Sequence, residues 1–296
     1  MGNEEKGLPY SFSFAPPPAD LARHVNGFYE LTYHEPVDEV LPAYSAQLMV
    51  SDGPGGFADF GNGLVPSYPN ASMFGPMTDA HRIVMPKPTV IYGASISIYG
   101  WAAITGLPAL KSSNRHIDAV TGLGETAGKA ALELGRQAGK LSSAEVFARL
   151  ADIIRSRAGI LPDGHAELID TTYRWLSGDL NPDLDDLYNC LPYSDRQVQR
   201  LIKQFFGLPP ARLKRQYRAL RAAIILSDPR VTDKERDSVY AAFYDQAHMI
   251  REVKQFTGHT PRWLEPGRIT FASTTLAAEY PEREPDANDS QQGDSR

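Results

Sequence analysis

The sequence predicts an α+β protein with a β-rich N-terminal domain (1–116), a helical linker (117–164) and an all-α domain (165–266). Three observations predict this order. Short apolar runs between Gly and Pro residues fill the first third, helical periodicity begins near Ile117, and one 21-residue segment occurs twice in the last third. A chain of 296 residues, 42% of them hydrophobic, is long enough to form two ordinary cores.

The N-terminal domain is predicted from runs that are too short for helices. They are bounded by breakers such as Gly53–Gly56 and Pro86–Pro88. The predicted strands are Tyr44–Val50, Arg82–Met85, Thr89–Tyr92 and Ser95–Trp101. Strands at this spacing are typical of a sandwich or barrel. The segment Ala19–Tyr33 predicts a short amphipathic helix at its edge.

The linker shows helical signals. Ser142 offers an N-cap with Glu145 in the first turn, and Val146, Leu150 and Ile154 mark one apolar face. We expect the linker to pack on the first domain; a dimer contact is the alternative.

The all-α domain is predicted to begin with a helix over Ala166–Ser177, stopped by Gly178. Asn181 is the predicted N-cap of the next helix, with Pro182 at its first position. The stretch 279–296 is rich in Asp, Glu, Ser and Gln and predicts a disordered acidic tail.

The repeated segment predicts two helix-turn-helix arms. Tyr193–Leu213 aligns without gaps on Tyr244–Leu264, 51 residues later, with 8 of 21 positions identical. In each copy a cap residue precedes a helix, which ends at Gly207 or Gly258. A Pro then opens the next helix.

Both repeated helices combine an apolar stripe with a polar face that carries Arg, Gln and Lys. Val198, Leu201, Ile202 and Phe205 follow helical spacing in the first copy. Arg can pair with guanine and Gln with adenine in a major groove. The candidate DNA-binding residues are Arg196, Gln197, Gln199, Arg200 and Lys203 in the first copy and Gln246, His248, Arg251 and Lys254 in the second. For His248, a local structural hydrogen bond is the alternative.

Charge supports a polyanion partner for the repeat region. Residues 194–264 carry 14 Lys/Arg and 7 Asp/Glu, whereas the remainder carries 16 and 29. The helix after Pro210 is predicted to join the two arms rigidly. Its basic residues are predicted to lie outside the buried stripe and to contact phosphates: Arg212, Lys214, Arg215, Arg218 and Arg221.

The segments Tyr244–Arg251 and Phe256–Pro261 resemble the signature of the AraC/XylS family of bacterial transcription regulators, and Ser194–Pro210 resembles its first arm. The front domain resembles the cupin-like sensor domain of such regulators, through Phe74–Thr78 and Tyr92–Ile98. The second arm departs from the pattern. Ala242 stands where the turn usually has Gly, and Lys234 and Asp237 stand at positions that are usually apolar.

The resemblance implies a cytoplasmic, sequence-specific DNA-binding regulator that is not an enzyme and needs no cofactor. Its implied partners are double-stranded DNA and a small-molecule effector, with RNA polymerase and a second copy of the chain as further candidates. The alternative hypothesis is a ligand-binding or catalytic β-barrel whose helical domain has lost DNA readout.

Other chemistry is weakly represented. No apolar run is long enough for a membrane helix, and a single cysteine, Cys190, excludes an internal disulfide. The residues His24, His34, Glu35 and His81 lack the spacing of a metal-binding cupin, so we expect no metal and interpret them as surface residues. The front-domain aromatic residues fit either a core or a ligand cavity: Tyr44, Phe57, Phe60, Tyr68, Phe74, Tyr92, Tyr99 and Trp101.

Overall fold

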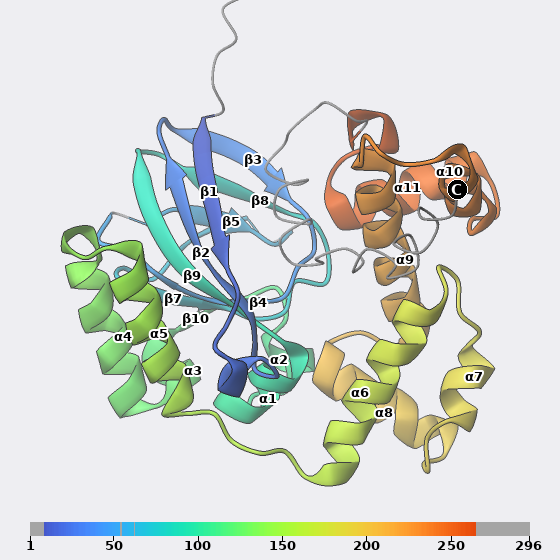
Figure 1. Cartoon of the computed structure of the whole chain (residues 1–296), viewed down its shortest axis with the longest axis horizontal. Helices are drawn as coiled ribbons and strands as arrows, with labels where there is room; N and C mark the ends of the chain where they lie inside the picture. Colours follow the sequence, from blue (N-terminus) through green and yellow to red (C-terminus); the bar gives the residue numbers. More distant parts are fainter. Residues whose placement is uncertain (1–8, 54, 62, 265–296) are drawn as a thin grey trace, which may run out of the picture.

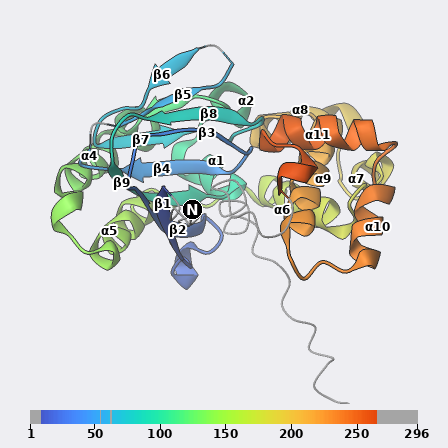
Figure 2. The ribbon, with the colours of Figure 1, turned by 90° about the horizontal axis from the view of Figure 1, so that it is seen from above.

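The computed structural model describes residues 9–53, 55–61 and 63–264. A β-rich part and a helical part lie next to each other (Figures 1 and 2). The predicted tail (279–296) and the last two residues of the predicted all-α domain lie outside the described residues. None of the described helices is long and apolar enough to cross a bilayer.

The β-rich part contains two antiparallel sheets. The larger has the strand order β1-β2-β9-β4-β7-β10 and the smaller β3-β8-β5-β6. The strands of the larger sheet are β1 (Tyr10–Ala15), β2 (Val25–Tyr33), β9 (Thr89–Ile96), β4 (Ala46–Val50), β7 (Ala71–Phe74) and β10 (His116–Asp118). Those of the smaller are β3 (Val37–Leu41), β8 (His81–Met85), β5 (Phe57–Asp59) and β6 (Leu64–Pro66). The predicted β-rich domain is therefore a two-sheet structure.

The register of the larger sheet separates its two faces. Successive side chains on a strand point to opposite faces, so residues that pair across strands share a face. One row consists of Tyr29, Gly93, Met49 and Ser72. The alternate row consists of Phe28, Ala94, Leu48 and Met73, all buried. The first row borders the space between the sheets, and the second packs under helices.

Those helices come from the predicted linker. They are α3 (Ala119–Leu123), α4 (Glu125–Gln137), a 3₁₀ turn η2 (Ala138–Lys140) and α5 (Ser143–Arg155). Figure 1 shows α4 and α5 beside the sheet. Leu134, Val146 and Leu150 are buried in one core with Leu48 and Met73. The predicted cap is present, because Ser142 and Glu145 form a capping box at the start of α5. Residues 119–155 thus pack on the β-rich part, as expected for the linker.

Two predictions in the front domain are wrong. The helix predicted over Ala19–Tyr33 is a 3₁₀ turn, η1 (Ala19–Leu21), followed by strand β2, because β2 pairs with a strand on each side. The strand predicted over Ser95–Trp101 stops at Ile96. There the Ser97 hydroxyl accepts a hydrogen bond from Gly100 N at 2.9 Å and caps helix α1.

The helical part forms two cores. Its elements, with the two short helices that lead from the β-rich part, are α1 (Ile98–Thr105), α2 (Ala109–Ser112), α6 (Asp163–Gly178), α7 (Leu184–Asn189), α8 (Asp195–Phe206), α9 (Pro210–Ser227), α10 (Asp233–Ala241), α11 (Gln246–Thr257) and η3 (Pro261–Leu264). The predicted cap Asn181 is wrong. Asp183 caps α7 by accepting from Asp185 N at 3.1 Å, and Pro182 precedes the helix.

Candidate nucleic-acid interface

The two repeated segments fold into matching helices, α8 and α11, which are the candidate recognition helices. Ser194 and Gln197 form a capping box on α8, and the Asp245 carboxylate accepts from His248 N at 2.6 Å on α11. Each helix ends at a left-handed glycine, Gly207 with φ 79° and Gly258 with φ 80°. The sequence prediction of both helix ends is confirmed by this geometry.

Each recognition helix buries one stripe. The first stripe consists of the predicted Val198, Leu201, Ile202 and Phe205. The second consists of Met249, Glu252, Val253 and Phe256. The opposite faces are exposed to solvent. Eight of the nine candidate residues are exposed there: Arg196, Gln197, Gln199, Arg200, Lys203, Gln246, Arg251 and Lys254.

Three candidate side chains have contacts within the protein. The Gln197 side-chain oxygen accepts a hydrogen bond from Ser194 N at 3.1 Å, and Gln199 Nε2 donates to the Tyr188 hydroxyl at 3.2 Å. His248 is half-buried, and its Nε2 lies 3.1 Å from Glu252 Oε2. The structure therefore gives His248 the local contact that was the alternative to a DNA contact.

The recognition helices lie at the two ends of α9 (Figure 1). Seen from above, both are placed towards the same edge of the helical part (Figure 2).

The buried carboxylate of Glu252 is the centre of a charged network between α9 and α11. Its side chain is inaccessible to solvent and lies 2.7 Å from the Arg218 guanidinium, which is only 7% exposed. Arg215 Nε lies 2.9 Å from the same carboxylate. Arg218 also donates to Asn181 Oδ1 at 2.9 Å and to the carbonyl of Ala242 at 3.1 Å. The network fixes α11 on α9.

The prediction that Arg218 lies outside the buried stripe of α9 is therefore wrong, and four of the five basic residues of α9 have contacts within the protein. Arg215 and Arg218 are paired with Glu252. Arg212 Nη2 bonds Asp79 at 2.7 Å, and Arg221 donates to the carbonyl of Asp179 at 2.9 Å. Arg218 is buried, whereas Arg212 and Arg215 keep partly exposed side chains and stay candidates for phosphate contacts.

Glu252 was missed in the sequence although a signal was present. In the alignment of the two copies it stands at the position of Leu201, in the middle of the apolar stripe. A carboxylate at a buried position needs a partner of opposite charge, because transfer of an unpaired charge from water into the protein interior costs many kcal/mol. The signal therefore pointed to a buried arginine nearby.

The β-rich part contacts the start of α9 and the C-terminal end of α11. The Asp79 carboxylate accepts from Arg212 on α9 and from Gln255 Nε2 on α11, the latter at 3.1 Å. Ala43 N donates to the carbonyl of Phe256 at 2.7 Å. His259 Nε2 donates to the carbonyl of Val40 at 3.2 Å. The N-terminal halves of α8 and α11 remain exposed.

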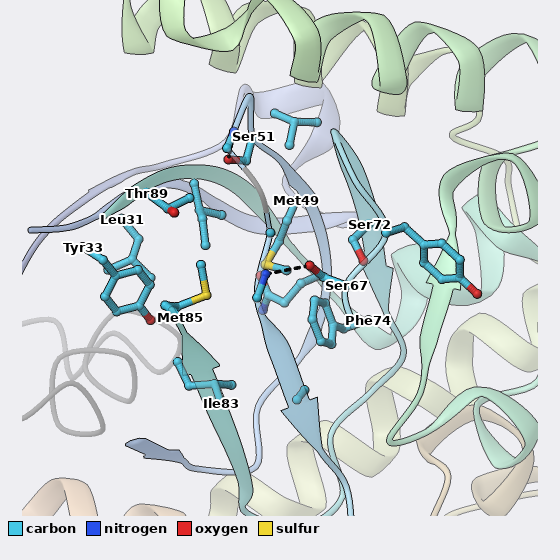
Figure 3. Close-up of a pocket in the computed structure, with 18 of the residues that line it drawn as sticks. Leu31, Tyr33, Met49, Ser51, Ser67, Ser72, Phe74, Ile83, Met85 and Thr89 are labelled. Atoms are coloured by element: carbon cyan, nitrogen blue, oxygen red, sulfur yellow. Dashed lines mark hydrogen bonds between the residues drawn. The ribbon is translucent and has the colours of Figure 1, made fainter. Parts of the chain in front are cut away.

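A cavity of about 110 Å³ lies between the two sheets. Figure 3 shows side chains from both sheets around it, among them Met49, Phe74, Ile83 and Met85. Of the front-domain aromatic residues, Tyr44, Phe57, Tyr68 and Phe74 line the cavity. The others are core residues or pack beside the core: Phe60, Tyr92, Tyr99 and Trp101.

The interpretation of His81 as a surface residue is wrong. Its side chain is 3% exposed, and its ring stacks on Phe60 with centroids 5.4 Å apart. Burial lowers the pKa of His81 to about 3, an effect that the neighbouring Asp79 backbone only partly offsets. Burial also lowers the pKa of His116 to about 4. Within the described ranges, no group of three or more His, Cys, Asp or Glu side chains is placed to hold a metal ion.

Known proteins resemble the chain in structure at low sequence identity. No protein-family model and no curated protein sequence matches it. ToxT from Vibrio cholerae O395 matches with 9% identity over 92% of this chain and 99% of that chain, at a TM-score of 0.44. The same protein bound to (E)-4-(8-methylnaphthalen-1-yl)but-3-enoic acid matches with 12% identity over 90% and 99%, at 0.45.

The AraC-like transcriptional activator CuxR also matches, with 9% identity over 69% of this chain and 78% of that chain, at a TM-score of 0.24. The description of CuxR as AraC-like refers to the family that the repeated segments resemble. At these scores the likeness does not tell what this chain binds, so the functional argument rests on the chain's own residues.

Proposed function

We propose that the protein is a sequence-specific DNA-binding transcription regulator in which α8 and α11 enter the major groove of one duplex. The observation that carries the proposal is the repeated geometry. Two capped helices bury one stripe each, end at equivalent glycines and expose Arg, Gln and Lys on the opposite face. This division suits a recognition helix.

Arg200 and Arg251 are the strongest base-contact candidates. They occupy identical positions in the two copies, both are exposed, and neither is engaged by an acidic side chain in the described structure. Arg196 lies one turn before Arg200, and Gln246 lies five residues before Arg251, in the first turn of α11. Lys203 and Lys254 lie near the C-terminal ends and suit phosphate contacts.

The second recognition helix offers apolar contacts too. Ala247 and Ile250 are exposed on α11, Ile250 at 37%. Short apolar side chains recognise the thymine methyl group in the major groove. We therefore assign the second half of the site a preference for thymine at one position.

Control by a small ligand is supported by continuity between the cavity and the recognition helices. Leu41 on β3 lines the cavity, and the adjacent Val40 bonds His259 beyond α11. Ile83 on β8 lines the cavity, and Asp79 precedes that strand and bonds Gln255. A ligand that shifts β3 or β8 changes how α11 is held.

The direct test is Arg200→Ala. Binding to duplexes from a random-sequence pool should weaken by about 1–3 kcal/mol and lose preference at one base pair, because a bidentate guanine contact is removed. Fluorescence anisotropy on variant duplexes measures both effects. Arg136→Ala is the matched control, since Arg136 is an exposed arginine on α4, far along the chain from both recognition helices. Equal weakening on all sequences would leave Arg200 with a phosphate role.

The domain limits (1–116, 117–164 and 165–266), cytoplasmic location, a contact with RNA polymerase and a homodimer stay predictions that follow from the sequence and the family resemblance. Activity as an enzyme is not part of the proposal.

A further inference from the structure

We propose that the cavity between the sheets binds a small uncharged molecule about the size of one ring, and that Ser72 and His116 receive its single hydroxyl or carbonyl group. The inference rests on the ligand control proposed above and names the chemical class of that ligand.

The lining excludes ions. Among the described residues around the cavity there is no Asp, Glu, Lys or Arg. His116 is the titratable imidazole in the lining, and its lowered pKa keeps it neutral at pH 7. A carboxylate entering this space would lose its hydration without gaining a counterion, which costs several kcal/mol. A neutral ligand avoids that cost.

The polar end of the site is set by two neighbouring strands. Ser72 is 4% exposed, and its hydroxyl has no hydrogen-bond partner among the described residues. Both ring nitrogens of His116 are buried and likewise lack a partner in the described part of the chain. His116 pairs with Phe74 across β7 and β10, so His116 and Ser72 share the cavity face of the sheet.

Buried polar atoms without a partner are uncommon and each costs about 1–3 kcal/mol. A neutral imidazole offers one donor and one acceptor, and a serine hydroxyl offers both. A ligand hydroxyl can therefore satisfy either group.

The volume of the cavity and the residues at its mouth limit the size of the ligand. A cavity of about 150 Å³ holds benzene in a protein core, and the space here is about 110 Å³. Phe14, Phe57 and Tyr68 line its mouth and are 37%, 40% and 44% exposed. The interior is therefore no larger than a single ring needs, and these aromatic side chains give it an apolar entrance.

The test uses the full chain with ¹³C-labelled methionine methyl groups and three ring compounds: benzyl alcohol, toluene and benzoate. Met49 and Met85 line the cavity, whereas Met73 is buried on the other face of the larger sheet and serves as the comparison. Benzyl alcohol should shift the Met49 and Met85 signals more than the Met73 signal, and bind at least about tenfold more tightly than benzoate.

Ser72→Ala separates the hydrogen bond from apolar burial. The variant should bind benzyl alcohol about fivefold more weakly and toluene unchanged, because only the alcohol loses a hydrogen bond. Benzoate binding as tightly as benzyl alcohol, an equal effect of Ser72→Ala on alcohol and toluene, or unmoved Met49 and Met85 signals would each overturn the assignment. If Ser72→Ala does not fold, the alcohol and benzoate titrations of the natural chain still decide. DNA binding of the ligand-free protein is measured separately, so failure here leaves that proposal standing.

Discussion

The two helix-turn-helix units carry the same repeated segment but are held in different ways. The first unit, α6 to α8 with the start of α9, shares an apolar core with α1, the short helix that leads from the β-rich part. In this core Tyr99 is buried beside Leu168 and Phe205. The second unit, the end of α9 with α10 and α11, has its own core. Its contacts with the β-rich part include the hydrogen bonds of Gln255, Phe256 and His259.

Matched positions show the same contrast. Tyr193 is half-buried against the first core, with its hydroxyl 3.4 Å from the carbonyl of Gly164, whereas its copy Tyr244 is 93% exposed. Leu201 packs in the first stripe, and its copy Glu252 is buried with two arginines. Apolar contacts fix the first unit, while directional polar contacts hold the second. We infer that the second unit is the one that a cavity ligand adjusts.

The largest effect is expected from a substitution that breaks the charged network around Glu252. Glu252→Ala should destabilise the second unit by about 3–5 kcal/mol, because it leaves the buried guanidinium of Arg218 without a counterion. Hydrogen exchange measured at increasing urea concentrations shows which helices lose stability. Protection should fall in α10 and α11 before α8.

Glu252→Gln is the matched control for that variant. It keeps the shape and the acceptor oxygen of the side chain, so its effect should be smaller than that of Glu252→Ala. Equal loss of protection in α8 and α11 would show that the two units unfold together and would contradict the contrast.

Acid should destabilise the β-rich part of the molecule. The pKa values of His81 and His116 are lowered in the fold to about 3 and about 4, so protonation favours the unfolded chain. Their stabilising effect is complete above the unfolded value near 6.5 and is lost as pH falls towards the folded values. Going from pH 7 to 5 should cost about 2 kcal/mol per histidine.

The free energy of unfolding measured against pH checks this expectation. His116→Phe should remove the contribution of His116 to the pH dependence of the free energy of unfolding between pH 6.5 and 5. Because both histidines lie in the β-rich part, hydrogen exchange corrected for intrinsic rates should show β strands and α8 losing protection more than α11. A slope that His116→Phe leaves unaltered would be the contrary result.

The smallest expected effect concerns the contacts of Asp79, which join the β-rich part to the helical part. Asp79→Asn weakens the contacts with Arg212 and Gln255, and a partly exposed pair of this kind is worth about 1 kcal/mol or less. Amide exchange in α11 should accelerate by up to about fivefold while α8 stays unchanged. Asp38→Asn is the control, since Asp38 pairs with Arg82 inside the β-rich part. Unaltered exchange in α11 would mean that Asp79 does not restrain it.

The sequence predicted the features that depend on local signals. The caps Ser142 and Asp245, the left-handed Gly207 and Gly258, and the stripe of α8 were all recognisable, because caps and spacing act within a few residues. The class of each domain followed from the same signals.

The errors arose where distant segments decide the structure. Val25–Tyr33 has helical spacing in its apolar residues but forms a strand, because β1 and β9 provide pairing partners on both sides. Arg218 was assigned to the exposed face of its helix, but Glu252, 34 residues later, draws it into the interior. The cavity of the candidate ligand site is bordered by strands from both sheets, so it could not be placed from local patterns.

The most direct test of the account is selection of bound duplexes from a random pool with the natural chain, Arg200→Ala and Arg251→Ala. The natural chain should enrich one site with two half-sites about 10 base pairs apart. Arg200→Ala should relax one half-site and Arg251→Ala the other. No enriched site with the natural chain, or relaxation of the same positions by both variants, would contradict the claim that α8 and α11 recognise one duplex together.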